Sequence, residues 1–129
     1  MKKNLKNGLA VRGYDLVLIV ENKKTIKGMQ SISVQHLGAN YRFVSEKNKQ
    51  LFLDNAEKYL PKYGGFCAIA MSEGILVDAN PKSFIFQDKK LFLFFSKYFR
   101  LIDTRRQWMK NPHELKHLAD VEWKTLQLN

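Results

Sequence analysis

The sequence predicts a small single α+β domain in which short antiparallel hairpins are combined with a central helix and C-terminal helices. The chain has 129 residues, which is enough for one hydrophobic core. Hydrophobic residues make up 45% of it, a value typical of a packed domain. Segments with alternating apolar residues are interspersed with segments of helical spacing, which indicates the α+β class. We assign residues 1–8 to a basic N-terminal tail and residues 9–129 to the domain.

The first half of the chain is predicted to form a strand, a hairpin and a helix. Residues 15–21 are rich in Leu, Val and Ile and end at a polar turn, which predicts a buried strand. Residues 31–37 alternate between apolar and polar side chains, and a second alternating segment follows after a turn, which predicts a hairpin. Ser45 is a favourable N-cap residue for the helix that Pro61 ends.

The second half begins with two predicted strands and a second hairpin. Residues 67–71 and 75–77 are apolar runs separated by a Ser-Glu-Gly turn, which predicts two short strands. Alternating apolar residues flank the polar turn at 87–90, which predicts the hairpin.

Two helices are predicted to close the chain. The first covers residues 95–108, with apolar residues on one face and arginines toward solvent. The residues that indicate this helix are Phe95, Phe99, Ile102, Gln107 and Trp108, and the arginines expected toward solvent are Arg100, Arg105 and Arg106. Asn111 and Pro112 have the residue types of an N-cap and a first helical position, and so predict the start of the second.

The composition favours a basic protein without a membrane span or a disulfide. The formal net charge is +10, but the basic excess lies at the two ends of the chain, so we favour a solvated basic surface over a nucleic-acid-binding role. The apolar runs are far shorter than the roughly 20 residues of a transmembrane helix. A single cysteine, Cys67, fits a reducing compartment. Polar residues interrupt the signal-like Met-Lys-Lys opening, so a cytoplasmic location is expected, with a periplasmic one as the alternative if an upstream export signal had been removed.

Several motifs together resemble the stand-alone YHS-domain family. The most specific is the Tyr-Gly-Gly-aromatic-Cys-Ala element at residues 63–68. The others are Gly13-Tyr14-Asp15, Tyr41-Arg42-Phe43-Val44-Ser45, Leu51-Phe52, Glu57-Lys58-Tyr59, Pro61, and a tail with Trp108, Asn111-Pro112, Ala119-Asp120 and Trp123. The resemblance covers roughly residues 9–126 and implies a treble-clef-like fold.

The resemblance also implies a link to soft metals such as copper, and the chain departs from it there. Where cysteine-bearing members have three thiols, this sequence has Leu18, Val44 and Asn48. Leucine and valine ligate nothing, and one amide is a poor ligand for a soft ion, so the inherited site is expected to be lost. The proline and second tyrosine of the opening motif of the stand-alone branch are missing as well.

Cys67 is the strongest single candidate for chemistry. It follows Gly64 and Gly65, whose backbone N–H groups can face an anion or lower the pKa of a thiol. We nevertheless favour a buried apolar role, since free cysteine is among the most buried residue types. With His36 and Met71 it could hold copper or zinc, although stable sites use three or four ligands. Tyr14, Asp15, Tyr63, Gly64 and Gly65 are the further candidates for a pocket or its backbone.

No enzyme template is recognised in the sequence. Residues 113–117 match a His-Glu-x-x-His string, but it lies at the start of a short C-terminal segment with no third ligand in view. We therefore expect a non-catalytic binding module of a metal-associated family that lacks the usual cysteine ligands. The alternatives are a protein-interaction or assembly domain, for a partner protein or a second copy of the chain, and a basic nucleic-acid-binding module.

Overall fold

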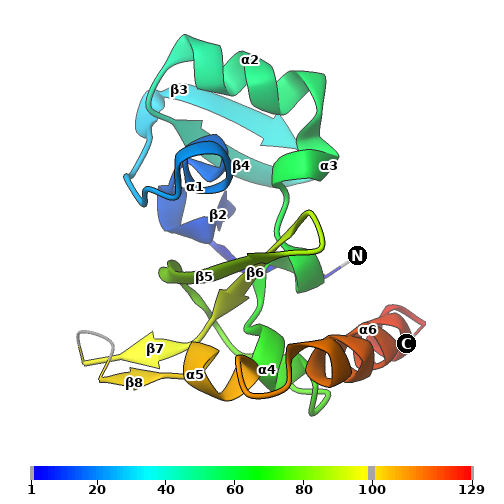
Figure 1. Cartoon of the computed structure of the whole chain (residues 1–129). Helices are drawn as coiled ribbons and strands as arrows, with labels where there is room; N and C mark the ends of the chain where they lie inside the picture. The colour runs from blue at the N-terminus through cyan, green and yellow to red at the C-terminus, as the bar shows by residue number, and fades with distance from the viewer. Residues whose placement is uncertain (1, 99–100, 129) are drawn as a thin grey trace.

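A four-stranded sheet with three helices forms the N-terminal part of the structure (Figure 1). The computed structural model describes residues 2–98 and 101–128. The sheet has the order β1-β2-β4-β3, with β2 and β4 parallel and the other neighbours antiparallel. Its elements are β1 (Leu5–Lys6), β2 (Leu9–Ala10), α1 (Leu16–Asn22), β3 (Met29–His36), β4 (Ala39–Phe43), α2 (Glu46–Asp54) and α3 (Ala56–Tyr59).

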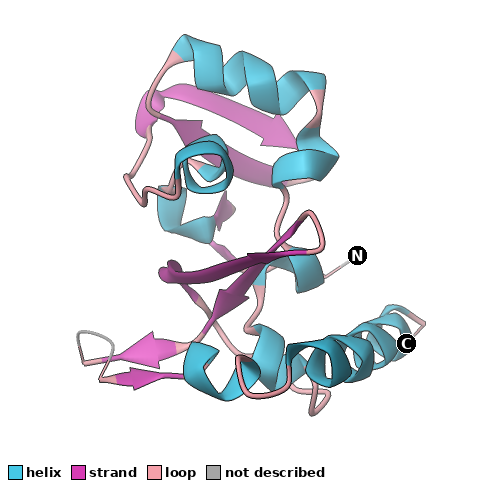
Figure 2. Cartoon of the chain, in the orientation of Figure 1, coloured by secondary structure: helices cyan, strands magenta, loops and turns pink. Residues whose placement is uncertain are grey.

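The C-terminal part consists of two hairpins and three helices, and the β5–β6 hairpin crosses the middle of the molecule (Figure 1). Its elements are α4 (Ala68–Met71), β5 (Asn80–Gln87), β6 (Lys90–Phe94), β7 (Ser96–Lys97), β8 (Ile102–Asp103), α5 (Arg105–Trp108) and α6 (Pro112–Gln127). Helices and strands occur in both parts (Figure 2), which confirms the predicted α+β class of this small single domain.

Three of the predicted elements are confirmed, and the helix predicted between Ser45 and Pro61 is confirmed in part, because it is divided at Asn55 into α2 and α3. The two hairpins are β3–β4 and β5–β6. The Ser45 hydroxyl accepts a hydrogen bond from the N–H of Asn48 at 3.1 Å, as expected of the N-cap of α2. The last helix, α6, begins at Pro112 directly after Asn111.

The strand predicted over residues 15–21 is wrong, because this segment forms α1. Asp15 accepts a hydrogen bond from the N–H of Leu18 at 2.9 Å and so caps the helix, and Lys23 ends it in a left-handed conformation. A short apolar run that is buried on nearly all sides has no periodicity that separates strand from helix.

The strands predicted over 67–71 and 75–77 are wrong for a similar reason. The first run is the short buried helix α4, and residues 75–77 lie outside any regular element. The helix predicted over 95–108 is replaced by the β7–β8 hairpin and α5, while Phe99 and Arg100 lie outside the described residues. Thr104 fixes this arrangement, because its N–H and its hydroxyl both donate to the Phe95 carbonyl at 3.0 Å.

Aromatic side chains make up much of the core. Phe92 and Phe94 of β6 pack against Trp108, with ring centroids 5.3 and 5.4 Å apart. In the N-terminal part, Phe52 of α2 packs against Tyr41 and Phe43 of the sheet. None of the helices in the described part of the chain is both long and apolar enough to cross a bilayer.

Candidate functional site

The segment between α3 and α4 contains three successive residues in the left-handed backbone region. Tyr63, Gly64 and Gly65 have φ values of +59°, +62° and +85°. A tyrosine rarely adopts this conformation, and such strain is concentrated at functional sites. The Tyr63 side chain is buried, and its hydroxyl donates to Asp120 of α6 at 2.8 Å. Burial, together with this hydrogen bond, raises the pKa of Tyr63, so the phenol stays neutral and remains a donor.

The N-terminal segment lies directly on this turn. The N–H of Asn4 donates to the Gly64 carbonyl at 2.9 Å, and the Asn4 amide donates to the Gly65 carbonyl at 3.2 Å. A Cβ atom on Gly64 would stand 2.3 Å from the carbonyl oxygen of Lys2, so only glycine permits this approach. Residues 2–6, predicted as part of a tail, are therefore in contact with the domain, and β1 extends its sheet.

The Asp78 carboxylate forms hydrogen bonds and an ion pair that also hold the N-terminal segment. It accepts from the Asn4 amide at 2.7 Å and from Arg12 at 2.8 Å, and it lies 3.1 Å from the Lys6 ammonium. Burial acts to raise the pKa of Asp78, but these hydrogen bonds outweigh it and lower the pKa to about 2.

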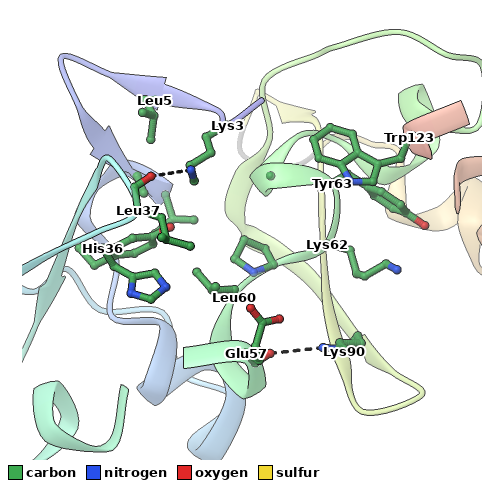
Figure 3. Close-up of a pocket in the computed structure, with 15 residues that line it drawn as sticks. Lys3, Leu5, His36, Leu37, Glu57, Leu60, Lys62, Tyr63, Lys90 and Trp123 are labelled. Carbon is green, nitrogen blue, oxygen red and sulfur yellow. Dashed lines mark hydrogen bonds between the residues drawn. The ribbon is translucent and has the colours of Figure 1, made fainter. Parts of the chain in front are cut away.

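The N-terminal segment, the Tyr63 turn and the β3–β4 turn surround a cavity of about 210 Å³ (Figure 3). Its walls are mainly apolar and aromatic: Val11, Tyr41, Leu60, Pro61, Tyr63 and Trp123 are among the lining residues. The Trp123 ring stands nearly edge-on to the Tyr63 ring, with centroids 6.2 Å apart. Apolar walls with a few polar groups are typical of small-molecule sites.

The polar groups around this cavity are His36, Glu57 and three lysines, Lys3, Lys62 and Lys90 (Figure 3). Lys62 forms an ion pair with Asp120 at 3.1 Å. Among the described residues, no carboxylate oxygen lies within 4.0 Å of the Nζ atom of Lys3 or Lys90.

Lys3 and Lys90 are each held by a backbone carbonyl instead. Lys3 donates to the carbonyl of Leu37 at 2.6 Å, and Lys90 donates to the carbonyl of Glu57 at 3.4 Å (Figure 3). An ammonium group has three donors, so both side chains keep donors for a further acceptor.

The predicted site residues are divided between two places. His36, Tyr63 and Gly64 line the cavity, while Gly65 is buried beside it in the turn. Cys67 is fully buried, its Sγ atom lies 3.5 Å from the Thr104 hydroxyl, and it borders a different hollow of about 230 Å³. Met71 is fully buried in α4.

This placement does not fit a soft-metal site. His36 packs against Tyr41 and Phe52 at the first cavity, whereas Cys67 borders the second hollow. Within residues 2–98 and 101–128, no cluster of three or more His, Cys, Asp or Glu side chains is placed to hold a metal ion. Stable sites need three or four donors, so the residues present cannot be expected to retain copper or zinc.

Asp15 and Tyr14 lie away from the cavity. Asp15 is fully buried, and its carboxylate accepts from the N–H groups of Leu18 and Val44 and from the amide of Asn48, each at 2.9 Å. Asp15 thereby joins α1, the end of β4 and α2. Tyr14 forms a β-bridge with Lys27.

The sequence does not predict that Lys3, Lys90 and Trp123 line the cavity. From the sequence, Lys3 is assigned to the N-terminal tail, and Trp123 is named only as part of the C-terminal motif. These residues meet only through tertiary structure, and nothing in their local sequence signals it. Comparison of the chain with protein-family models, with curated proteins and with solved structures finds no match.

Proposed function

We propose that the chain is a non-catalytic binding module and that the cavity beside Tyr63 takes the apolar body of a small molecule. The observation that carries this proposal is the partly open, mainly apolar cavity that lies beside the left-handed turn at Tyr63. Tyr63 persists in its unfavourable conformation because Asp120 and the core hold its side chain. A turn with a purely structural role would not require a cavity beside it.

The size and lining of the cavity indicate what kind of molecule fits. Its volume of about 210 Å³ is below the roughly 300 to 1,000 Å³ of drug-sized pockets, so a small ligand is expected. Tyr41, Tyr63 and Trp123 offer ring faces and edges to an apolar or aromatic body.

The lining also favours binding over catalysis. No serine, threonine or cysteine is found among the described residues that line the cavity. The one carboxylate among its described lining residues, Glu57, belongs to an exposed residue. A binding role agrees with the resemblance to the stand-alone YHS proteins, with an organic ligand in place of the metal.

The test uses a neutral probe, phenylpropanol, followed by amide NMR. Saturable shifts are expected at Gly64 and Leu60. Leu60→Phe fills part of the cavity and should weaken binding about tenfold or more. The matched control is Leu53→Phe, since Leu53 is exposed on α2 and does not line the cavity. Absence of saturable shifts, or equal weakening by both variants, would refute the proposal.

A second candidate function is protein interaction or self-association, favoured by apolar side chains exposed near the β7–β8 hairpin. Leu101 is 76% exposed, Met109 65% and Tyr98 63%. Exposed apolar side chains of this size are found at many interaction surfaces. Sedimentation of the wild type and of the double variant Leu101→Ser, Met109→Ser tests this candidate. The candidate fails if both proteins are monomeric and if both still sediment equally after a cell extract is added.

A further inference from the structure

We infer that the ligand of the cavity is a carboxylate: a small apolar molecule whose single negative charge lies against the ammonium groups of Lys3 and Lys90. This inference rests on the proposed binding function and deepens it.

The first step is the balance of charge around the cavity. Three lysines line it against one glutamate, Glu57. Lys62 is neutralised by Asp120 at 3.1 Å, which leaves Lys3 and Lys90 as the cations to consider. The chain as a whole has a formal charge of +10, so its long-range field also attracts anions.

The second step is how Lys3 is held. Its ammonium group reaches the carbonyl of Leu37 in the β3–β4 turn at 2.6 Å. The backbone next to it is fixed by the Asn4–Gly64 hydrogen bond and by the contact of the Asn4 amide with Asp78. Lys3 is therefore positioned beside the cavity by contacts on both sides, which lowers the entropic cost of using it to bind a ligand.

The third step concerns Lys90 and its neighbour Glu57. Lys90 donates a hydrogen bond to the backbone carbonyl of Glu57, and not to the Glu57 carboxylate (Figure 3). The donor–acceptor distance is long, at 3.4 Å. A weak hydrogen bond to a neutral acceptor is readily exchanged for a stronger one to a carboxylate. The negative charge of the Glu57 carboxylate repels an anion in the cavity. A ligand with a single negative charge is therefore favoured over a more highly charged one.

The final step separates a carboxylate from a phosphate. Two lysines opposed by one glutamate match one negative charge better than two. The mostly apolar lining requires that the rest of the ligand be apolar.

The experiment compares three probes with the same phenylpropyl body near neutral pH: phenylpropanoate, phenylpropanol and protonated phenylpropylamine. The expected order of affinity is acid, alcohol, amine, with the acid about tenfold tighter than the alcohol. The preference for the acid should fall as salt is added.

The lysines are tested with matched variants. Lys3→Met and Lys90→Met should each reduce the preference for the acid about threefold or more, and the control Lys47→Met, at an exposed position on α2, should not. Lys3→Arg keeps the charge and should retain most of the preference, which separates loss of charge from disturbance of the N-terminal segment.

The outcomes distinguish the two proposals. Binding of all three probes with equal affinity would overturn the carboxylate and leave the binding function intact. Tighter binding of the amine would reverse the inferred charge of the ligand. A preference for the acid that survives both lysine variants would refute the assignment to Lys3 and Lys90. If none of the probes binds, both proposals fail.

Discussion

The Asp15 carboxylate and the two lysines at the cavity are charged groups in opposite situations. Asp15 is fully buried and accepts three hydrogen bonds from three segments of the chain. Lys3 and Lys90 each donate to one backbone carbonyl and border an open space. A buried charge that is fully hydrogen-bonded holds the fold together, whereas a positioned charge with donors to spare is suited to binding a ligand.

The Asp15 carboxylate joins three segments of the chain. It accepts hydrogen bonds from the backbone N–H groups of Leu18 and Val44 and from the side-chain amide of Asn48. This junction is therefore a structural feature of the fold.

The largest effect is expected at this junction. Asp15→Ala removes the N-cap of α1 and leaves the partly buried donors of Val44 and Asn48 without their acceptor, so the free energy of unfolding should fall by about 3 kcal/mol. Urea unfolding measures it. Affinity for the probes should stay within about twofold wherever the variant is folded, because Asp15 does not line the cavity.

The control for this variant is Asp54→Ala, which removes an exposed carboxylate that accepts a hydrogen bond from Gln50 of its own helix. Its effect should be within about 0.5 kcal/mol. Equal effects of the two substitutions would remove the basis for treating Asp15 as a structural junction.

The next largest effect is expected at the strained turn. Gly64→Ala adds a Cβ atom 2.3 Å from the Lys2 carbonyl oxygen, so the N-terminal segment must move. The unfolding free energy should drop by about 2 to 3 kcal/mol, with loss of probe binding. In Gly38→Ala the new Cβ meets nothing within 4 Å although φ is +86°, so this control isolates backbone strain, about 1 kcal/mol. If Gly64→Ala leaves probe binding intact, the N-terminal segment is not part of the site.

A smaller effect is expected at Cys67, the strongest single candidate for chemistry in the sequence, whose favoured buried role agrees with its full burial. Cys67→Ser places a hydroxyl in a fully buried position and should cost about 1 to 2 kcal/mol, with Cys67→Ala at about 1 kcal/mol. Neither should change the affinity for phenylpropanoate, and the wild-type thiol should not react with a thiol reagent in the folded protein. Rapid thiol reaction together with weakened binding would move the functional site to the second hollow.

The sequence predicts some elements of this fold and not others for identifiable reasons. Both central hairpins follow from alternating residues around polar turns, and α2 and α6 from Ser45 and Asn111-Pro112. Helices α1 and α4 are too short and too fully buried to show a helical period, so their apolar runs resemble strands. The β7–β8 hairpin replaces a predicted helix because Thr104 binds back to Phe95.

The sequence predicts only the central residues of the candidate site. Tyr63 and Gly64 stand out in the sequence because a Gly-Gly pair marks an unusual backbone, and the cavity does lie beside them. Lys3 and Lys90 look like any solvated lysine in the sequence. Their position depends on two long-range contacts, Asn4 on Gly64 and α3 beside β6, which no local pattern encodes.

The smallest effect is expected at Asp78, which fixes the segment that carries Lys3. Its folded-state pKa of about 2 lies below the ordinary value, so its stabilising contribution is complete above about pH 4 and is lost as the pH falls toward 2. The carboxylate is partly exposed and screened, so Asp78→Asn should cost less than about 1 kcal/mol at neutral pH and flatten the loss of stability in acid. Urea unfolding at several pH values measures this, with Asp88→Asn in the exposed β5–β6 turn as the control. Because Asn4 and Lys3 are neighbours, Asp78→Asn should also weaken phenylpropanoate binding by about twofold, while Asp88→Asn leaves it unchanged. An unchanged affinity in Asp78→Asn would mean that the Asn4–Gly64 contact alone positions Lys3.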